Sequence, residues 1–163
     1  MSRLAGMEDR AAYSAENCSV ARTLAVVGEK WTFLVLREVF YGVRRFSDLQ
    51  ANLGIARNLL ASRLNTLTDH GILRRTSYQD PGSRSRQEYQ LTDKGRDLFP
   101  ALVALMQWGD TYLADPAGPA VMIRHKDCDQ PVRAVLQCVA GHHPLTARDT
   151  HPIPGPGVRR AVS

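Results

Sequence analysis

Hydrogen-bonding side chains gather on one expected helix in the middle of the chain. Between Gly54 and Gly71 leucines recur at helical spacing, and no acidic residue occurs before Asp69. Arginine and asparagine can pair bidentately with the edges of guanine and adenine. A helix face with two arginines and no acidic residue also favours a polyanion as its ligand. An ordinary solvated helix face is the alternative for this stretch alone. The candidate contact residues are Arg57, Asn58, Ser62, Arg63 and, further along the helix, Asn65.

A second set of chemically capable side chains lies near the C-terminus. Two short segments each pair an imidazole with a thiol, and these groups are ligands that zinc prefers. A structural zinc site needs a hairpin that brings both segments together, and Asp129-Gln130-Pro131 supplies turn residues for it. The alternative is a small metal-free hairpin packed on the domain, and no other cofactor is expected. The candidate ligands are His125, Cys128, Cys138 and His142.

Positive charge is concentrated in one segment. Eight arginines and three acidic residues lie between Arg44 and Arg86, so this segment alone accounts for the net charge of +5 of the 163-residue chain. Basicity that gathers on one segment is typical of a nucleic-acid contact surface. The charge distribution therefore favours a DNA-contacting helix over an ordinary surface helix.

The elements expected around this helix form a helix-turn-helix. A short helix over 47–53, a turn at Gly54 and a longer helix over 57–69 have the dimensions of that motif, in which the first helix supports the second in the major groove. We expect Ser47 and Gln50 to form a capping box that opens the first helix. Two earlier helices are expected over about 20–27 and 31–40, and the large apolar side chains of the second make it the centre of the core.

Two strand-like runs after this motif predict a β-hairpin. Residues 72–78 and 87–91 flank a basic loop with Pro81-Gly82, which is strong turn chemistry. A hairpin directly after a helix-turn-helix is the wing of a winged helix, whereas a merely soluble loop is the alternative. Residues expected at phosphate or in the minor groove are Lys30, Arg44, Arg45, Ser83, Arg84 and Arg86, the last three at the tip of the wing.

A long apolar helix is expected after the hairpin, from a cap at Thr92 to about residue 114, with a kink at Pro100. Its two apolar stripes exceed what one small domain covers, so part of it should pack on a second copy; a wholly intramolecular helix is the alternative. The predicted fold class is mainly α with a small β-hairpin wing (α+β), a winged helix-turn-helix that dimerises through its terminal helices. The expected boundaries are an arm over 1–17, the winged domain over 18–114, a Cys/His extension over 115–151 and a flexible tail over 152–163.

Several classes of protein are excluded by composition. No apolar run approaches the roughly 20 residues that span a bilayer, and the acidic N-terminus lacks the features of a signal peptide. Three cysteines, an odd number, fit a reducing compartment. We therefore expect a cytoplasmic protein without membrane attachment. An enzyme is not expected, because the chain offers neither a phosphate-binding glycine loop nor a nucleophile with an adjacent base.

Short motifs in a specific order resemble the HxlR-type winged-helix transcriptional regulators, which are relatives of the MarR group. The resemblance extends from Cys18 to about Tyr112. It implies a homodimer that binds operator DNA, with helix 57–69 in the major groove and the wing alongside. The motifs are Cys18-Ser-Val, Gly28-Glu-Lys-Trp31, Gly42-Val-Arg-Arg-Phe-Ser-Asp-Leu49, Gly54-Ile55, Leu60-x-x-x-Leu64-x-x-Leu67-x-x-x-Gly71, Tyr89-x-Leu-Thr92-x-x-Gly95 and Trp108-Gly109.

The chain departs from the pattern of this family at three places. Ser19 stands where the family often has proline after the cysteine, and Glu29 stands where it often has a second glycine. In some members that N-terminal cysteine looks like a sensor of oxidants or electrophiles, so Cys18 is a candidate redox sensor, with a buried, inert thiol as the alternative. Some members carry an extension with His-x-x-Cys and Cys-x-x-Cys; here Gly141 replaces the last cysteine, and His142 is the candidate substitute.

The function expected from these observations is regulation of transcription. We expect a bacterial homodimer that binds double-stranded DNA sequence-specifically at an inverted-repeat operator, with recognition helices roughly 34 Å apart. The alternative is a winged-helix module for protein interaction or for metal or redox sensing, without direct operator binding, because fold alone does not fix function. A small-molecule or redox effector would act between the dimerisation helices and the winged domain, and no residue set identifies it.

Overall fold

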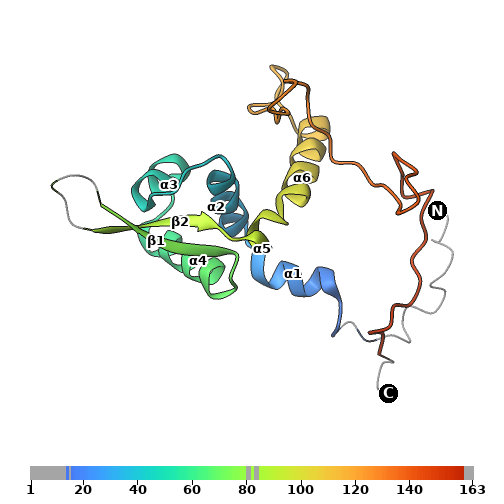
Figure 1. Ribbon diagram of the computed structural model, residues 1–163, viewed down its shortest axis with the longest axis horizontal. Helices are drawn as coiled ribbons and strands as arrows, with labels where there is room; N and C mark the ends of the chain where they lie inside the picture. The colour runs from blue at the N-terminus through green and yellow to red at the C-terminus, as the bar shows by residue number, and fades with distance from the viewer. Residues whose placement is uncertain (1–13, 15, 80–81, 83–84, 160–163) are drawn as a thin grey trace. The chain divides into compact units, whose positions relative to one another are not determined.

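The computed structural model describes residues 14, 16–79, 82 and 85–159. The chain divides into two compact units: Thr23–Leu105 forms one, and the parts through Arg22 and from Met106 onward form the other. Figure 1 shows the elements in chain order. They are α1 (Ser19–Val27), α2 (Lys30–Phe40), α3 (Phe46–Leu53), α4 (Arg57–Asp69), β1 (Leu73–Tyr78), β2 (Arg86–Leu91), α5 (Asp93–Arg96) and α6 (Phe99–Tyr112).

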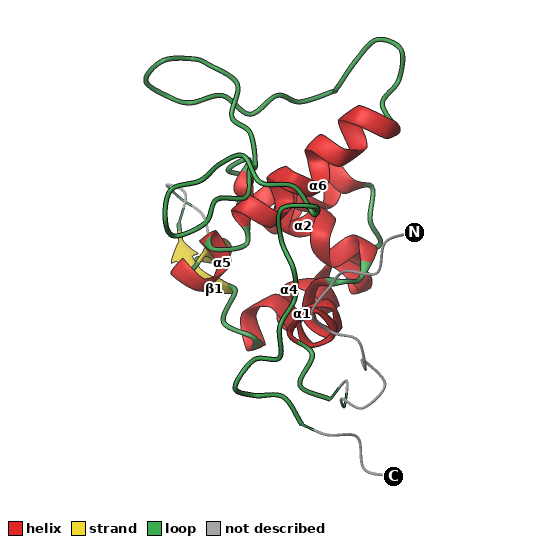
Figure 2. Cartoon of the chain, turned by 90° about the vertical axis from the view of Figure 1, so that its right-hand side faces the viewer, coloured by secondary structure: helices red, strands yellow, loops and turns green. Residues whose placement is uncertain are grey.

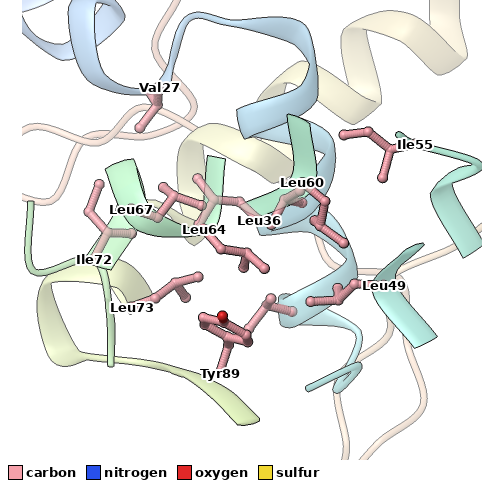
Figure 3. Packing of buried hydrophobic residues seen from close by; sticks show 12 residues of the cluster. Val27, Leu36, Leu49, Ile55, Leu60, Leu64, Leu67, Ile72, Leu73 and Tyr89 are labelled. Atoms are coloured by element: carbon pink, nitrogen blue, oxygen red, sulfur yellow. The ribbon is translucent and has the colours of Figure 1, made fainter. Parts of the chain in front are cut away.

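The core of the unit Thr23–Leu105 forms around α2 and α4. The predicted leucine stripe is confirmed, because Leu60, Leu64 and Leu67 of α4 are fully buried (Figure 3). They belong to one apolar cluster with Val35 and Leu36 of α2 and with residues of α3 and the hairpin. Burial of one face of α4 leaves its other face outward, which is the geometry that a recognition helix needs.

The turn between α3 and α4 has the predicted geometry. Gly54 ends α3 in the left-handed region with φ 59°, where a side chain would be strained. Ile55 then enters the core, and α4 begins at Arg57 after the extended residue Ala56. The helix-turn-helix predicted over 47–69 is therefore confirmed.

The predicted capping box at the start of α3 is wrong. The helix begins at Phe46, its N-cap is Arg45, and no side chain caps it. Ser47 lies inside the helix and donates its hydroxyl hydrogen to Asp48. The cause is a long-range contact: the Tyr89 N–H donates to the carbonyl of Arg44 at 2.9 Å, and Arg45 forms a bridge with β2, so the chain stays extended until Phe46.

β1 and β2 form the predicted antiparallel hairpin, in a register that pairs Leu73 with Leu91 and Tyr78 with Arg86. Arg86 is therefore the first residue of β2 and not part of the loop at the tip, because the ladder extends one pair further than its apolar pattern suggested. Ser83 and Arg84 lie outside the described residues.

The predicted single helix after the hairpin is two helices. The Thr92 hydroxyl accepts the N–H of Gly95 at 3.1 Å, but the helix that it caps, α5, ends at Arg96. Pro100 is the second residue of α6, so the predicted kink is wrong and proline occupies the first turn, where its missing N–H costs nothing. The first turn of α6 packs on α2 through Phe40 and Phe99, whose ring centroids lie 5.1 Å apart.

Beyond α6 the described chain contains turns and two isolated bridges but no further helix or strand (Figure 2). None of the described residues from 113 to 159 is buried. Gln107 of α6 binds the middle of this segment, because its side-chain amide donates to the carbonyl of Val132 at 2.7 Å and accepts the N–H of Ala134 at 3.0 Å. Further along, Asn17 donates to the carbonyl of Gly157 at 3.0 Å. Among the residues described, no helix is long and apolar enough to cross a membrane.

Candidate nucleic-acid interface

The outward face of α4 carries four of the five residues predicted to read bases. Arg57, Asn58, Ser62 and Asn65 are exposed, whereas Arg63 is only partly exposed. The face is short, since it begins at the first residue of the helix and covers about two turns. Guanidinium, amide and hydroxyl groups offer donors and acceptors in a mixture that matches the edges of bases in a major groove.

Arg57 lies against the supporting helix. Its guanidinium carbon is 5.2 Å from the centroid of the Phe46 ring, in the first turn of α3. A cation over an aromatic ring is attracted to the ring's electron density and loses some of its freedom to rotate. The contact therefore orients the arginine at the N-terminal end of α4, which is the end that contacts bases in helix-turn-helix proteins.

Arg63 is only partly exposed and forms an ion pair with Glu29, a partner that the sequence analysis did not predict. Its Nη2 lies 3.8 Å from the carboxylate of Glu29, and the arginine side chain is 22% exposed against 65% for the glutamate. Nε of Arg63 is buried and has no hydrogen-bond partner in the described structure. Arg63 is thus less accessible than Arg57, and Glu29 competes for its charge. The replacement of glycine by Glu29 was the sequence signal for this pair.

Asn65 is hydrogen-bonded to the hairpin. Its side-chain oxygen accepts a hydrogen bond from Nη2 of Arg75, which belongs to β1. The amide group of Asn65 keeps its two N–H donors, so its capacity toward a base edge is reduced but not lost. Arg75 was not among the predicted contact residues, and its pairing with α4 depends on the fold rather than on sequence spacing.

Two of the basic residues predicted to contact the DNA backbone, Arg44 and Arg45, contact side chains of the hairpin. The guanidinium of Arg45 lies 4.5 Å from the centroid of the Tyr78 ring in β1, and Nη1 of Arg44 lies 3.9 Å from the carboxylate of Glu88 in β2. Arg44 and Arg45 also line a polar cavity of about 400 Å³ together with Glu88. Lys30 and Arg86 are exposed. The loop before α3 and the hairpin therefore present their cations from one connected surface.

A buried carboxylate fixes the supporting helix. Glu38 of α2 is 7% exposed, accepts hydrogen bonds from Arg37 at 2.7 and 3.2 Å, and accepts another from the side-chain amide of Asn52 in α3 at 3.0 Å. A buried carboxylate with several donors is costly to disrupt, because removing its partners leaves a charge without solvation. Sequence reasoning missed this group, although a glutamate inside the apolar run of α2 was the available signal.

The other candidate residues lie outside this surface. Nδ1 of His125 lies 3.2 Å from Sγ of Cys128, and Sγ of Cys138 lies 3.1 Å from Nδ1 of His142. Among the described residues, no group of three or more His, Cys, Asp or Glu side chains is arranged to hold a metal. Asp129-Gln130-Pro131 closes the turn of the first pair, as the bridge between Arg124 and Pro131 shows, and does not join the two pairs as expected. Cys18 is a free, partly exposed cysteine directly before α1.

Comparison with known proteins identifies relatives along most of the chain. A family described as HxlR-like helix-turn-helix matches residues 26–116. The uncharacterized HTH-type transcriptional regulator Rv3095 of Mycobacterium tuberculosis strain H37Rv is 50% identical over 149 residues, which cover 91% of this chain and 92% of the relative. A second such regulator, sll1512 of Synechocystis, is 38% identical over 97 residues, which cover 59% of this chain and 70% of the relative.

Solved structures of transcription factors share the fold. The crystal structure of the transcription factor PA1607 superposes with a TM-score of 0.74 at 43% identity and covers 84% of this chain and 94% of its own. The transcription factor PA1374 from Pseudomonas aeruginosa superposes with a TM-score of 0.58 at 33% identity, covering 86% and 94%. The redox regulator HypR in its oxidised form gives 0.54 at 29% identity, covering 60% and 100%. This chain therefore belongs to the HxlR-like family of DNA-binding helix-turn-helix transcriptional regulators, and it is not an enzyme.

Proposed function

We propose that the protein regulates transcription by binding an inverted-repeat operator as a homodimer, with α4 of each copy in a major groove. The observation that carries this proposal is the division of α4 into two faces. Leu60, Leu64 and Leu67 are fully buried, while Arg57 and Asn58 at its first turn are exposed. Because operator DNA is chromosomal, the proposal implies that the protein acts in the cytoplasm.

Within this proposal the residues of α4 differ in role. Arg57, Asn58 and Ser62 read bases directly, because they are exposed at the N-terminal half of the helix. Arg63 reads a base only when it leaves Glu29, since the two groups are paired at 3.8 Å. Asn65 acts with Arg75, which holds its oxygen.

Contacts to phosphate or to the minor groove come from the surface around the wing. Arg44, Arg45 and Arg86 are exposed cations on the hairpin and the loop before α3, and Lys30 is an exposed cation at the start of α2. The role predicted for Ser83 and Arg84, which lie outside the described residues, stays a prediction. Contacts of this class fix register and add affinity for every sequence alike.

The homodimer is supported by apolar side chains that the described chain leaves in solvent. On α1 these are Val20 and Leu24, exposed by 67% and 57%. On the last two turns of α6 they are Leu105, Trp108 and Tyr112, exposed by 55%, 55% and 68%. Large apolar groups gathered on helices mark a protein interface, and a second copy is the partner that an inverted-repeat operator requires.

Base-reading and phosphate-binding arginines should respond differently to replacement. Arg57→Ala should weaken operator binding by about 1–3 kcal/mol and leave binding to random duplex nearly unchanged, because it removes a base contact. Arg44→Ala should weaken binding to both DNAs alike and lower the salt slope by about 1. Salt-titrated binding to the upstream region and to random DNA measures both effects. Equal losses on the two DNAs for Arg57→Ala would exclude base reading by that residue.

The Glu29–Arg63 pair predicts a coupled effect on affinity. Glu29→Gln should tighten operator binding up to about fivefold, because an exposed ion pair of at most about 1 kcal/mol no longer competes for the guanidinium. In an Arg63→Ala background the same replacement should have no effect. A double-mutant cycle by fluorescence anisotropy measures the coupling. Tightening that persists without Arg63 would mean that Glu29 acts on DNA only through its own charge.

The homodimer can be tested on one exposed aromatic residue. Trp108→Ser should shift the mass in sedimentation equilibrium from two chains to one at micromolar concentration, because it removes the largest apolar group exposed on α6. Val139→Ser is the control, since Val139 is an apolar residue outside the terminal helices that is even more exposed than Trp108. A wild-type protein that sediments as one chain would refute the dimer.

A redox input through Cys18 is a second candidate function. The thiol is partly exposed and lines a cavity of about 300 Å³ formed with residues of the arm and the tail, so small oxidants have access to it. The similar structure of HypR belongs to a protein described as a redox regulator.

Hydrogen peroxide, which converts an accessible thiolate to a sulfenic acid, should weaken operator binding by at least tenfold. Cys18→Ser should remove this response, and Cys128→Ser should keep it. The measurement is operator affinity before and after peroxide treatment. A response that is the same in Cys18→Ser and in the wild type would exclude Cys18 as the sensor.

A further inference from the structure

Cys18 lies in a cavity whose walls come from two distant parts of the chain. Both parts belong to the compact unit that contains the chain through Arg22 and from Met106 onward. One wall is the end of the N-terminal arm, and the other is the segment 153–159, which we call the strap. The cavity has a volume of about 300 Å³. The C-terminal part of the chain therefore helps to form the surroundings of the thiol.

Two hydrogen bonds fix the strap to the arm. The backbone N–H of Ser14 donates to the carbonyl of Arg159 at 2.9 Å, and the side-chain amide of Asn17 donates to the carbonyl of Gly157 at 3.0 Å. Asn17 directly precedes Cys18, whereas Gly157 follows Asn17 by 140 residues. The second bond thus attaches the strap next to the thiol.

The amide of Asn17 is held at both of its ends. Its oxygen accepts a hydrogen bond from Nη1 of Arg22 at 3.0 Å, while its nitrogen donates to the strap. The N–H of Arg22 in turn donates to the carbonyl of Cys18 at 3.0 Å. Because an amide bonded at its oxygen and at its nitrogen has one orientation, Asn17 places the strap in a defined position beside Cys18.

A turn within the strap allows its backbone to approach Asn17 closely. The N–H of Val158 donates to the carbonyl of Gly155 at 3.1 Å, which closes a turn that contains Gly157. A Cβ at Gly157 would lie 2.7 Å from Nδ2 of Asn17, so only a residue without a side chain permits this contact. The two prolines of the strap have a fixed φ, which lowers the entropic cost of ordering it.

The size of the cavity limits what can reach Cys18 while the strap is bound. A volume of about 300 Å³ is at the lower end of the roughly 300–1,000 Å³ that small-molecule pockets span. One water molecule takes up roughly 30 Å³ in the liquid, so hydrogen peroxide, with two oxygen atoms, fits with room for solvent. A reagent larger than the cavity reaches the sulfur only after the strap has left Asn17.

We propose that the strap makes Cys18 selective for reactants of the size of hydrogen peroxide and protects it from bulky disulfides and other large thiol reagents. This inference rests on the redox input proposed for Cys18 and names the class of its reactant. In the reaction with peroxide the thiolate sulfur attacks one oxygen, the S–O bond forms, the O–O bond breaks and hydroxide leaves. The sulfur is thereby oxidised to a sulfenic acid and the peroxide is reduced.

The test compares two alkylating reagents of different size on the full-length protein. Iodoacetamide is small, and a maleimide attached to polyethylene glycol is large; each forms a sulfur–carbon bond with a thiolate. Cys128 is exposed and reports the intrinsic reactivity of each reagent. The measured quantity is the labelling rate of Cys18 divided by that of Cys128, followed by mass spectrometry of the unmodified peptides.

In the wild type this ratio should be lower for the large reagent than for the small one. Opening of two hydrogen bonds shifts an equilibrium roughly 5- to 150-fold, and the ratio should differ by that factor. This comparison needs no variant, so it does not depend on whether a variant folds.

Variants of the strap and of its partner assign the effect. Gly157→Ala should raise the ratio for the large reagent to that for the small one, because the added Cβ displaces the amide of Asn17. Asn17→Ala should do the same, since it removes the donor. Gly155→Ala is the matched control: it lies in the same turn, no atom lies within 4 Å of its added Cβ, and it should keep the wild-type ratio.

Several results would overturn the proposal. One is a wild-type ratio that is equal for the two reagents, and another is a Cys18 that neither reagent labels. A third is a ratio that both Gly157→Ala and Asn17→Ala leave unchanged, or that Gly155→Ala raises as much as Gly157→Ala does. Labelling is measured without DNA. An operator affinity that does not respond to peroxide would therefore refute the redox input, whereas the labelling ratios decide on the strap.

Discussion

The burial of one face of α4 against α2 is the interaction on which the rest of the structure depends. Leu60, Leu64 and Leu67 are fully removed from solvent, and each contributes about 1.5–3 kcal/mol of favourable transfer free energy. A helix fixed along one side cannot rotate, so its opposite side keeps a constant orientation toward a ligand. Recognition of a base edge requires such constancy, because its hydrogen bonds tolerate only small displacements. The apolar stripe therefore determines which polar residues of α4 face outward.

The remaining elements of the winged unit secure the position of that face. Glu38 binds Asn52 and so holds the supporting helix α3 on α2. The carbonyl of Arg44 accepts the N–H of Tyr89, which attaches the basic loop before α3 to the hairpin. Gly95 completes the junction after β2, since a Cβ at this residue would lie 2.3 Å from the carbonyl oxygen of Ile72. Supporting helix, basic loop and wing are thus connected to one another by polar contacts as well as by the core.

The sequence predicted those elements well whose bounds depend only on residues close to one another in the chain. The leucine spacing predicted the helix over 57–69, which is α4, and Gly54 marked the turn before it. Prediction failed where distant residues decide. The strand bridge at Arg45 displaced the start of α3 from the expected cap at Ser47. The last helix was expected to be continuous, but the chain leaves α5 after Arg96 and starts α6 at Phe99, which puts Pro100 in a first turn. The site shows the same division: the type of residue on α4 was predictable, but the partners Glu29 and Arg75 come from other elements and carry no spacing signal.

Those partners bear on how a strongly basic segment discriminates between DNA sequences. Arg63 faces Glu29 and Arg44 faces Glu88, at 3.8 and 3.9 Å. One partner of each pair is exposed to solvent, so each pair is worth about 1 kcal/mol. An exchange of carboxylate for phosphate is therefore nearly neutral, because one anion replaces another. An exchange of carboxylate for a guanine edge adds two directed hydrogen bonds, which only the correct base supplies. In the proposed complex the arginine leaves its acidic partner on either DNA, so the ion pair lowers the affinity for the operator and for random DNA alike. Specificity in that complex therefore comes from the directed hydrogen bonds to the base, while the acids lower the affinity of the basic surface for every sequence.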